Sequence, residues 1–540
     1  MNDQTREATP QQAPPERPKL NHIVFWPPFL LLLTAIVTNF VAPKQYQAAI
    51  DGFRNIILDN FSWLFIGVAA ASLMLCVVIC FSPFGRVRFG GDQAKPLLSM
   101  WNWFAITICT TIAIGILFWS AAEPVSHLVE PPAGMGIEAE SQAAITFSLS
   151  TMYLHWSFTP YSIYCVASLM FAFAFYNMRQ PFSLGSTLAP LTGGNMPKSV
   201  GNVIDAVCLF ALVAGMAAAL GTGILMIGSG LEDLTGIKSG YLLWAAIAAT
   251  IVVTFIVSSA TGLMKGIRIL SDINTKLLLG LALVPLFFGP GLWLLMSDGG
   301  TALGDYVVNF IPRTFDFTAS DWAKDWTIFY WAVWLAWAPV TACFLGRIAY
   351  GRTVREFMLV NFILPSIFAI TWMTIFGGTA MHLQIEAGQL SQLVENNQQS
   401  LITFKMFESF PFTTALSVFY MCSAFVCFVT SSDSNVSAMA GISSSGISPD
   451  APEGNPWLKV AWGTVVGSVA WIMISFSASG VHGVKTLSHL GGFRQRFCRC
   501  LLLFLWRSSY GNTQTWIRQN KSRSWARQSS GLLRTTLTRS

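Results

Sequence analysis

The chain has 540 residues, of which 53% are hydrophobic and only 11% are charged, and its mean hydropathy is +0.54. About a quarter of the residues in a soluble domain are charged, so this composition excludes an ordinary soluble protein and indicates a polytopic membrane protein. The formal charge of +6 comes from the carboxyl end: residues 493–540 hold ten Lys or Arg and no acid, and subtracting those ten leaves −4 for residues 1–492. The body of the chain therefore offers no basic face for nucleic acid.

Apolar stretches long enough to cross about 30 Å of hydrocarbon follow one another from the amino end. The first 22 residues are polar, rich in Gln and Pro and without a signal-peptide pattern, so we expect residues 1–22 to be a disordered tail. Residues 23–492 are expected to form one transmembrane domain. Its eleven spans should begin near Val24, Trp63, Phe104, Phe147, Val203, Tyr241, Leu277, Thr327, Phe357, Thr413 and Trp457, with a weak twelfth after Val484.

The basic residues orient these spans, because Lys and Arg accumulate in cytoplasmic loops. If the amino terminus is cytoplasmic, that side collects the larger group: Arg6, Arg17, Lys19, Arg86, Arg88, Lys95, Arg179, Lys198, Lys265, Arg268, Arg347, Arg352 and Arg355. The opposite side then holds the smaller group: Lys44, Arg54, Lys238, Arg313, Lys324, Lys405 and Lys485. We therefore expect a cytoplasmic amino terminus.

Two apolar segments are interrupted in a way that is typical of transport sites. They read TIAIGILFWSAAEP, residues 111–124, and FVTSSDSNVSAMAG, residues 428–441. Transporters built from inverted repeats place substrate and ions where helices are broken by Gly or Pro. The second segment puts five polar side chains, Thr430 to Ser434, at membrane depth, which indicates an ion or substrate path. The alternative is that these hydroxyl groups only bond helix carbonyls.

Other unusual residues along the chain have structural interpretations. Residues 211–230 are mostly Gly and Ala, which allows close helix packing. Glu123 and Asp205 stand near the ends of apolar segments, where we expect their carboxylates to reach water rather than to form a proton relay. His155, beside Trp156, is expected to be a hydrogen-bonded structural residue.

The densest aromatic segment is DWTIFYWAVWLAWAP, residues 325–339, which contains Trp326, Tyr330, Trp331, Trp334 and Trp337. Indole faces attract a cation within about 6 Å, and an aromatic cage is the usual site for a quaternary ammonium group. The segment therefore predicts a box for a methylated onium solute. The alternative is an aromatic belt at the membrane interface. Trp334 and Trp337 fall near the middle of the expected helix, which favours the box, whereas Trp331 fits a belt best.

Motifs for other chemistries are missing from the sequence. There is no G-x-x-x-x-G-K-[ST], which weighs against an ATP motor in this chain. There is no H-E-x-x-H and no G-x-S-x-G, so we expect no enzyme activity. The ten Cys stand singly or at helical spacing, as Cys76 and Cys80 do, without a C-x-x-C pair. We expect no cofactor, no structural metal and no disulfide.

Taken together, these segments resemble the betaine/carnitine/choline transporter (BCCT) family, and the resemblance runs from about Pro27 to Gly492. It rests on DWTIFYWAVWLAWAP with FLGRIAYGRTVREF after it, and on LFWSAAEP, HWSFTPYSIY, KGIRILSDIN and VTSSDS in the expected order. The resemblance implies an all-α fold of about twelve transmembrane helices, in which the third to the twelfth form two inverted five-helix repeats of the sodium-symporter type. It also implies a homotrimer in the inner (plasma) membrane of a bacterium.

The resemblance further implies the substrate-binding residues: Trp156, Tyr161 and Tyr164 on the fourth helix, Trp331, Trp334 and Trp337 on the eighth, and Gly115 on the third. Val333 stands where the family usually has Trp, so the box is one indole short. This leaves open a bulkier onium solute or weak binding of a small one. Choline-selective members carry an acid at the position of Gly115. Because Gly115 supplies no carboxylate, a zwitterion such as glycine betaine is favoured.

The coupling ion is inferred from the same resemblance. The family's sodium ligands would fall on the side chains of Thr430 and Ser431 and on the carbonyls of Cys109 and Ile112. A second sodium site looks weaker, since two alanines occupy its positions: Ala218 and Ala219. Sodium-independent carnitine exchangers carry Arg and Met at two further positions, and this chain has neither: Asn274 and Thr341. We expect sodium symport, with one sodium ion per cycle or protons left open.

The sequence therefore predicts a secondary transporter that imports an osmoprotective onium zwitterion such as glycine betaine by sodium symport. One alternative is proton-coupled uptake of choline or carnitine. Another, from a different class, is an osmotic sensor that signals without net flux and uses the basic tail as its output.

The carboxyl end departs from the family, whose members continue past a glycine pair such as Gly491-Gly492 into a full twelfth helix. Here Arg494, Arg496 and Arg499 stand where the hydrocarbon core should be. Each Arg near the bilayer centre costs at least about 2.5 kcal/mol, so we expect the twelfth helix to be disrupted. We attribute the basic segment 493–540 to a frameshift. The alternative is a regulatory tail that touches anionic lipid.

Overall fold

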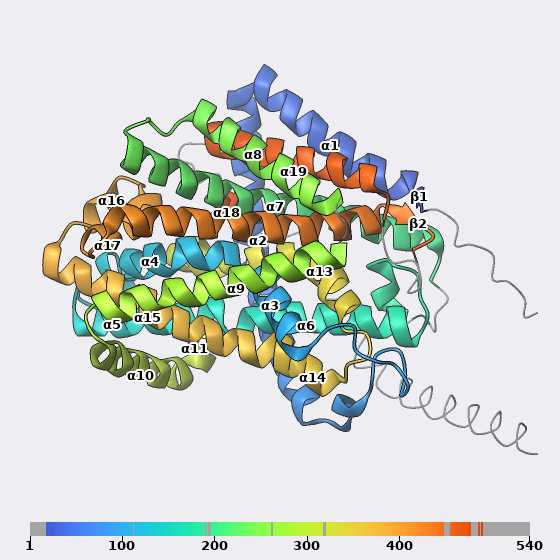
Figure 1. Cartoon of the computed structure of the whole chain (residues 1–540), viewed down its shortest axis with the longest axis horizontal. Coiled ribbons are helices and arrows are strands. Elements are labelled where there is room, and N and C mark those ends of the chain that lie inside the picture. Colours follow the sequence, from blue (N-terminus) through green and yellow to red (C-terminus); the bar gives the residue numbers. More distant parts are fainter. Residues whose placement is uncertain are drawn as a thin grey trace, which may run out of the picture.

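The protein is described by a computed structural model that covers residues 18–111, 113–189, 192, 196–260, 263–316, 320–447, 454–476, 484–486 and 488–489. It is a bundle of long helices packed side by side along its long axis (Figure 1). Within the described residues, ten helices are long and apolar enough to cross a membrane, or eleven when a bent pair counts as one span. The eleven expected spans are thereby confirmed. Most of the expected twelfth, and all of residues 493–540, lie outside the described residues.

The amino-terminal half has seven spans, of which the third and the fourth are each broken into shorter helical pieces. In order they are α1 (His22–Val41), α2 (Pro43–Phe81), α3 (Met100–Thr111) with α4 (Ala113–Val129), α5 (Gln142–Trp156) with α6 (Phe158–Ala172) and the π-helical turn η3 (Phe173–Asn177), α7 (Lys198–Thr235), α8 (Tyr241–Ala260) and α9 (Leu263–Phe288).

The spans of the other half are α12 (Asp321–Ala323) with the π-helical turn η5 (Lys324–Ile328) and α13 (Phe329–Ile348), α14 (Val354–Met358) with the π-helical turn η6 (Leu359–Ile363) and α15 (Leu364–Ala387), α18 (Thr413–Ile442) and α19 (Pro456–Phe476). Short helices form the connections: η1 (Pro83–Arg86), η2 (Ala133–Met135), η4 (Gly185–Leu188), α10 (Leu292–Val308), α11 (Phe310–Thr314), α16 (Ser391–Glu395), η7 (Gln399–Leu401) and α17 (Ile402–Glu408).

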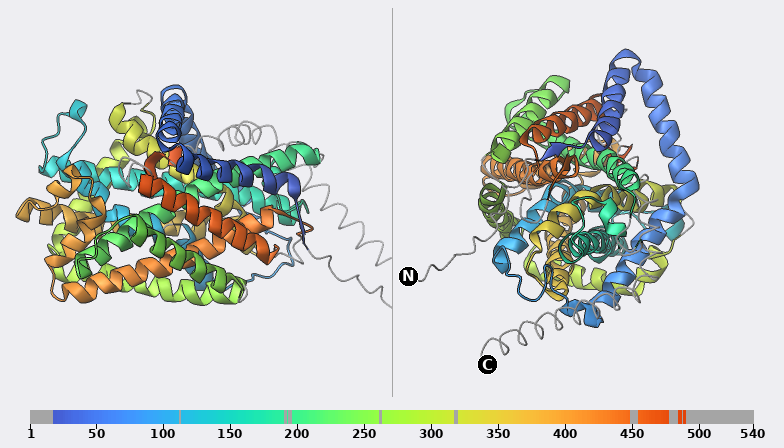
Figure 2. Two further views of the ribbon diagram at one scale, coloured as in Figure 1. Left: turned by 90° about the horizontal axis from the view of Figure 1, so that it is seen from above. Right: turned by 90° about the vertical axis from the view of Figure 1, so that its right-hand side faces the viewer.

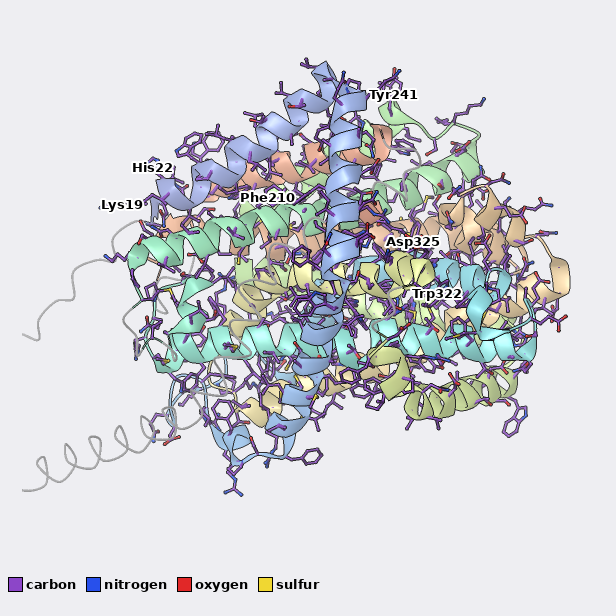
Figure 3. The ribbon with its side chains drawn as sticks, turned by 180° about the vertical axis from the view of Figure 1, so that it is seen from behind. Lys19, His22, Phe210, Tyr241, Trp322 and Asp325 are labelled. Carbon is purple, nitrogen blue, oxygen red and sulfur yellow. The ribbon has the colours of Figure 1, made fainter. Side chains whose placement is uncertain are left out.

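The first two helices stand apart from the rest of the bundle. Helix α1 lies at the periphery (Figure 2, right), and α2, the blue helix that crosses the others in Figure 3, packs against α6. The chain turns sharply between them because Pro43 opens α2, where the missing N–H of proline costs no helical hydrogen bond.

The remaining spans pack in a reciprocal pattern that identifies two repeats. Helix α4 packs against α15 while α6 packs against α13, and α7 packs against α19 while α8 packs against α18. These contacts are exchanged when the five spans from α3 to α9 are swapped with the spans that begin at α13. Because five is an odd number, the second repeat starts from the opposite side of the membrane. The inverted-repeat arrangement of the sodium-symporter type follows for the described spans.

Helix α7 runs through the middle of the bundle, and its small residues explain how closely its neighbours approach. A Cβ atom added to Gly223 would lie 1.8 Å from the Phe428 ring of α18, and one added to Gly230 would lie 2.4 Å from the Phe404 ring. The interpretation of residues 211–230 as a close-packing surface is confirmed.

The amino-terminal segment is partly ordered. Strand β1 (Lys19–Leu20) pairs antiparallel with β2 (Ser444–Ser445), beyond the end of α18, and Asn21 N–H donates to the Ser443 carbonyl over 2.9 Å. The segment we expected to be a disordered tail therefore ends earlier than residue 22. Residues 1–17 lie outside the described residues.

Asp205, which we expected to reach water, is buried. Its Oδ1 accepts hydrogen bonds from the backbone N–H groups of Leu184 (2.7 Å) and Gly185 (3.2 Å), at the start of η4. The carboxylate therefore anchors the loop before α7, and the expectation of an exposed group was wrong.

Candidate functional site

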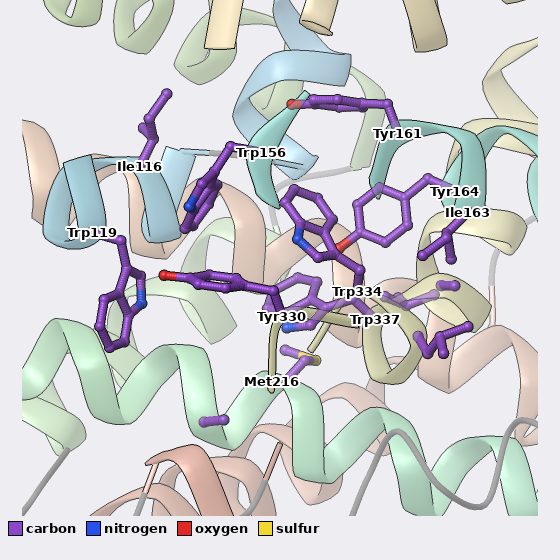
Figure 4. Packing of buried hydrophobic residues seen from close by; sticks show 14 of the residues in the cluster. Ile116, Trp119, Trp156, Tyr161, Ile163, Tyr164, Met216, Tyr330, Trp334 and Trp337 are labelled. Atoms are coloured by element: carbon purple, nitrogen blue, oxygen red, sulfur yellow. The ribbon is translucent and has the colours of Figure 1, made fainter. Parts of the chain in front are cut away.

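A cavity lies between the broken helix α3–α4, the end of α5, and helices α7, α13 and α18. Its cavity volume is about 60 Å³. Five large aromatic side chains on its wall, which we call the aromatic box, come from three helices: Trp119, Trp156, Tyr330, Trp334 and Trp337 (Figure 4). The ring centroids of Trp156 lie 5.2 Å from Tyr330 and 5.6 Å from Trp334, in edge-to-face orientations. Such faces turned toward one small space suit a cation.

One face of α13 supplies most of the box. Tyr330, Val333, Trp334 and Trp337 stand at helical spacings of three, four and seven residues, so they share a face. Trp331 lies about 120° around the helix from Trp337. Its buried ring packs edge-on against His155, 5.9 Å between centroids, and is not on the wall of the cavity. Within the box, Tyr330 thus occupies the place that we had given to Trp331.

The three aromatic residues around the α5–α6 break take different places. Trp156 ends α5, and the chain leaves the helix at Ser157 with φ −111° and ψ −119°. Tyr164 also lines the cavity, 4.9 Å from the Trp334 ring. Tyr161 is fully buried behind Trp334, at 5.7 Å, and is not on the cavity wall. Tyr161 therefore packs against the Trp334 ring and does not line the cavity.

Gly115 lies where the helix axis bends by 55° between α3 and α4, and it faces the cavity. A Cβ atom at this position would lie 2.5 Å from Cη2 of Trp156, closer than packed atoms allow. Glycine is therefore required for the indole to lie flat against the start of α4.

Glu123, on α4, is fully buried, and the expectation that it reaches water was wrong. Its Oε2 accepts a hydrogen bond from Trp156 Nε1 over 2.9 Å. Its Oε1 lies 2.6 Å from His155 Nδ1 and 3.3 Å from His127 Nε2. A buried carboxylate requires such partners, because hydrogen bonds and opposite charge must replace lost water. We call these three residues the acid–histidine cluster: Glu123, His127 and His155.

Of the four expected ion ligands, Ser431 is on the wall of the cavity. Its Oγ lies 3.4 Å from the Thr110 carbonyl at the end of α3. Thr430 donates its hydroxyl hydrogen to the Val426 carbonyl over 2.7 Å, which agrees with the alternative that these hydroxyl groups bond helix carbonyls. The Thr430 hydroxyl oxygen still has lone pairs with which it can accept another partner. Helix α3 ends at Thr111, so the negative end of its helix dipole lies beside Ser431.

The other residues discussed for coupling lie close to this end. Cys109 belongs to the last turn of α3. Its thiol sulfur accepts a hydrogen bond from Asn274 Nδ2 at 3.4 Å, so the neutral amide of Asn274, rather than a cationic side chain, lies beside Cys109. Ala218 and Ala219 are on the cavity wall beside Thr222. Ile112 lies outside the described residues.

Several cavity residues were missed from the sequence. Trp119, Phe329 and Tyr330 belong to the wall, as do Thr110 and Thr111. Tyr330 shares a helical face with Trp334 and Trp337, but Trp331 also lies within reach of Trp334, so the sequence did not choose between them. Trp119 gave no signal, because its contact with Tyr330 joins residues from two distant segments.

Fold and site together define a polytopic membrane protein with an aromatic cavity at the centre of an inverted-repeat bundle. The family model described as "BCCT, betaine/carnitine/choline family transporter" matches residues 23–513, which includes the start of the basic carboxyl segment. The chain belongs to this family of transporters.

Named relatives agree with this assignment. The glycine betaine transporter OpuD of Bacillus subtilis is 30% identical over 84% of this chain and 88% of its own length. Glycine betaine transporter 1 of Vibrio parahaemolyticus is 32% identical over 83% and 85%, and an ectoine/hydroxyectoine transporter of Virgibacillus pantothenticus is 27% identical over 87% and 92%. Among solved structures, a Na+-coupled sialic acid symporter matches 79% of this chain and 85% of its own, with a TM-score of 0.44 and 16% identity.

Proposed function

We propose that the protein imports a quaternary ammonium zwitterion such as glycine betaine, with sodium as the coupling ion. The observation that carries the proposal is the aromatic box, in which faces of Trp119, Trp156, Tyr330, Trp334 and Trp337 surround one central cavity. A methylated onium group cannot form an ordinary hydrogen bond, and aromatic faces are the groups that attract it.

The cavity offers separate partners for the two charges of a zwitterion: the start of α4 for the carboxylate and the aromatic box for the onium group. Helix α4 begins at Ala113, and Gly115 in its first turn lines the cavity, so the positive end of the α4 helix dipole favours a substrate carboxylate there. The aromatic box adjoins this end of α4 at Trp156, which packs against Gly115, and extends from there to Trp337. Among the described residues no carboxylate side chain lines the cavity, so a net cation finds no full counter-charge on this part of the wall. A zwitterion therefore fits better than choline.

Sodium fits the donors at the end of α3. The ligands we propose are the hydroxyl groups of Thr430 and Ser431 and the backbone carbonyls of Cys109 and Ile112. Hard cations prefer such neutral oxygen donors when the helix dipole adds negative potential. The approach of Ser431 to the Thr110 carbonyl supports this placement. An ion at this position would hold α3 and α18 together, and substrate would then close the cavity from the box side by alternating access.

The remaining expectations belong to the same proposal. We place the protein in the inner membrane of a bacterium with a cytoplasmic amino terminus, as a homotrimer, and we retain the basic segment 493–540 as a departure from the family that disrupts the twelfth helix. Sequencing the gene and translating its other frames beyond residue 493 tests the last point: an apolar continuation of about 20 residues supports a frameshift.

Uptake of labelled glycine betaine into sealed proteoliposomes tests the function. Accumulation that requires an inward sodium gradient, and that potassium does not support, is the expected result. Accumulation driven by a proton gradient without sodium would establish proton-coupled transport instead, with choline and carnitine as the competing substrates to assay. Saturable binding without uptake in any gradient would favour the osmotic sensor.

A further inference from the structure

The acid–histidine cluster is a buried, titratable group that the proposed transport cycle does not use. Glu123, His127 and His155 have no exposed surface, and their three facing atoms lie within 4.8 Å of one another. The cluster touches the aromatic box directly, because Trp156 donates its indole hydrogen to Glu123. A change of charge here is therefore felt inside the box.

A second cavity lies beside the cluster, among residues of η2, α5, α11, α12 and η5. Its volume is about 450 Å³, and the polar residues on its wall include Arg313, Asp316 and Ser320. Thr327 is on its wall, and Thr327 Oγ1 lies 3.0 Å from His155 Nε2. We call it the Thr327 cavity. Figure 3 shows Trp322, which also lines it, close to Asp325 on the segment that covers the cluster.

These contacts form a continuous hydrogen-bonded chain from the Thr327 cavity to the box. It runs from the Thr327 hydroxyl to His155 Nε2, from His155 Nδ1 to Glu123 Oε1, and from Glu123 Oε2 to Trp156 Nε1. The Trp156 N–H can only donate, so the Glu123 oxygen that faces it accepts. We assign the neutral His155 a hydrogen on Nδ1, donated to Oε1, and leave Nε2 to accept from Thr327.

We propose that Glu123, His127 and His155 form a proton-binding site that is reached through the Thr327 cavity and at which one proton competes with the onium group in the aromatic box. The inference rests on the proposed onium-binding function of the box. A proton from the cavity forms an N–H bond at His155 Nε2, the N–H bond at Nδ1 breaks, and an O–H bond forms at Glu123 Oε1. His155 ends neutral in its other tautomer, and one proton has been taken up.

The charges around the cluster explain why proton and onium group compete. On α4 and α5 the titratable neighbours are His127 and His155, and on α13 the neighbour is Tyr330. Beyond them, Lys485 lies 4.0 Å from the centre of the Trp326 ring, and Arg54 pairs with Asp325 at 3.0 Å. Two cations, Lys485 and Arg54, balance two carboxylates, Glu123 and Asp325, so these described groups sum to zero. Protonation of Glu123 leaves them at +1, which disfavours a cation in the box.

Polar side chains on the neighbouring helices α15 and α18 have partners outside the acid–histidine cluster. His382 of α15 pairs with Asp298 of α10 at 2.6 Å, and Tyr420 of α18 donates to the Leu117 carbonyl. Protonation also weakens the indole contact, since a neutral carboxyl oxygen is a poorer acceptor than a carboxylate. Both effects act on Trp156, a wall of the box.

Titration of substrate affinity against pH tests the proposal. The purified full-length protein is held in detergent, and the dissociation constant of glycine betaine is measured by tryptophan quenching from about pH 8 to about pH 5, a range that spans the usual pKa of histidine. The expected result for the natural protein is a loss of affinity of roughly tenfold toward low pH. Glu123→Gln, which cannot gain the proton, should bind weakly at every pH with a flat profile.

Asp298→Asn is the matched control, because Asp298 is also a buried carboxylate paired with a histidine but does not contact the box. It should keep the affinity and the pH dependence of the natural protein. An unchanged affinity across the pH range, or a slope that persists in Glu123→Gln, overturns the proposal while leaving onium binding intact. Absence of glycine betaine, choline and carnitine binding at every pH overturns the function of the box and the proposal together.

A second measurement needs no variant. If a proton and the onium group compete, binding must release protons, by thermodynamic reciprocity. Addition of glycine betaine to the natural protein in weak buffer near pH 6 should acidify a pH-indicator dye, by up to about one proton per bound substrate. Binding without release of protons contradicts the proposal.

Discussion

Gly115 and Trp156 share one small space: the Cα of the glycine lies so close to the indole that a Cβ atom would be 2.5 Å from Cη2. The box wall and the start of α4 are therefore a single packed unit. The zwitterion preference inferred for Gly115 therefore depends on the position of Trp156 as well as on charge.

Gly115→Ala should weaken glycine betaine binding, because the methyl group displaces the indole. The cost of such overpacking is about 1 to 3 kcal/mol, which corresponds to a loss of affinity of fivefold or more. Tryptophan quenching of the purified variant measures it. Gly300→Ala is the control, since a Cβ atom at Gly300 meets nothing within 4 Å. Equal affinities of the two variants would contradict the shared packing.

Trp334→Ala and Trp337→Ala should each weaken onium binding by about 1 to 2 kcal/mol, the size of a desolvated cation–π contact. Trp331→Ala changes an indole of the same helix that lies off the cavity wall, so it should affect thermal stability more than affinity. Melting temperature and dissociation constant are measured for all three. If Trp331→Ala weakens binding as much as Trp334→Ala does, the assignment of the cavity wall to the Tyr330 face is wrong.

Val333→Trp should tighten glycine betaine binding relative to larger betaines, because Val333 lines the cavity where the family usually has a further indole. The available space is small, and a Trp that does not fit would instead reduce the yield of folded protein. Competition between glycine betaine and a bulkier betaine, measured on monodisperse protein, distinguishes these results. A parallel change for both substrates would argue against a missing wall.

Ser431→Ala should raise the sodium concentration needed for half-maximal uptake several-fold and leave the order of substrate preference unchanged. The reason is the loss of a hydroxyl ligand beside the end of α3. Ser434→Ala is the matched control, since its hydroxyl bonds the Thr430 carbonyl within α18. Uptake by Ser431→Ala with unaltered sodium dependence would exclude this hydroxyl from the ion site.

The order of the spans and the aromatic face of α13 could be predicted because both are periodic in the sequence. The choice between Tyr330 and Trp331 could not. Both residues lie within reach of Trp334 on the helix surface, and only the packing of α13 on α6 and α7 decides which one faces inward. When a helix carries aromatic residues on several faces, as α13 does, its sequence alone does not show which face points into the bundle.

The burial of Glu123 could not be predicted for a related reason. A carboxylate near the end of an apolar run is stable in water or among donors, and its donors here come from another span, at His155 and Trp156. Their adjacency in the chain was visible, but their distance from Glu123 was not. Asp205 shows the same limit, since its partners are backbone N–H groups of a loop that has no distinctive sequence.

The pairing of Lys19 and Leu20 with Ser444 and Ser445 ties the segment before α1 to the segment that follows α18. Its far partner follows α18, the helix that carries Ser431, and Trp462 of α19 donates to Ser443 Oγ beside it at 2.9 Å. A truncation that removes the residues through Leu20 should therefore loosen the carboxyl end of α18, the helix on which we propose the sodium ligands Thr430 and Ser431. For purification, a tag should therefore leave Lys19 and Leu20 in place.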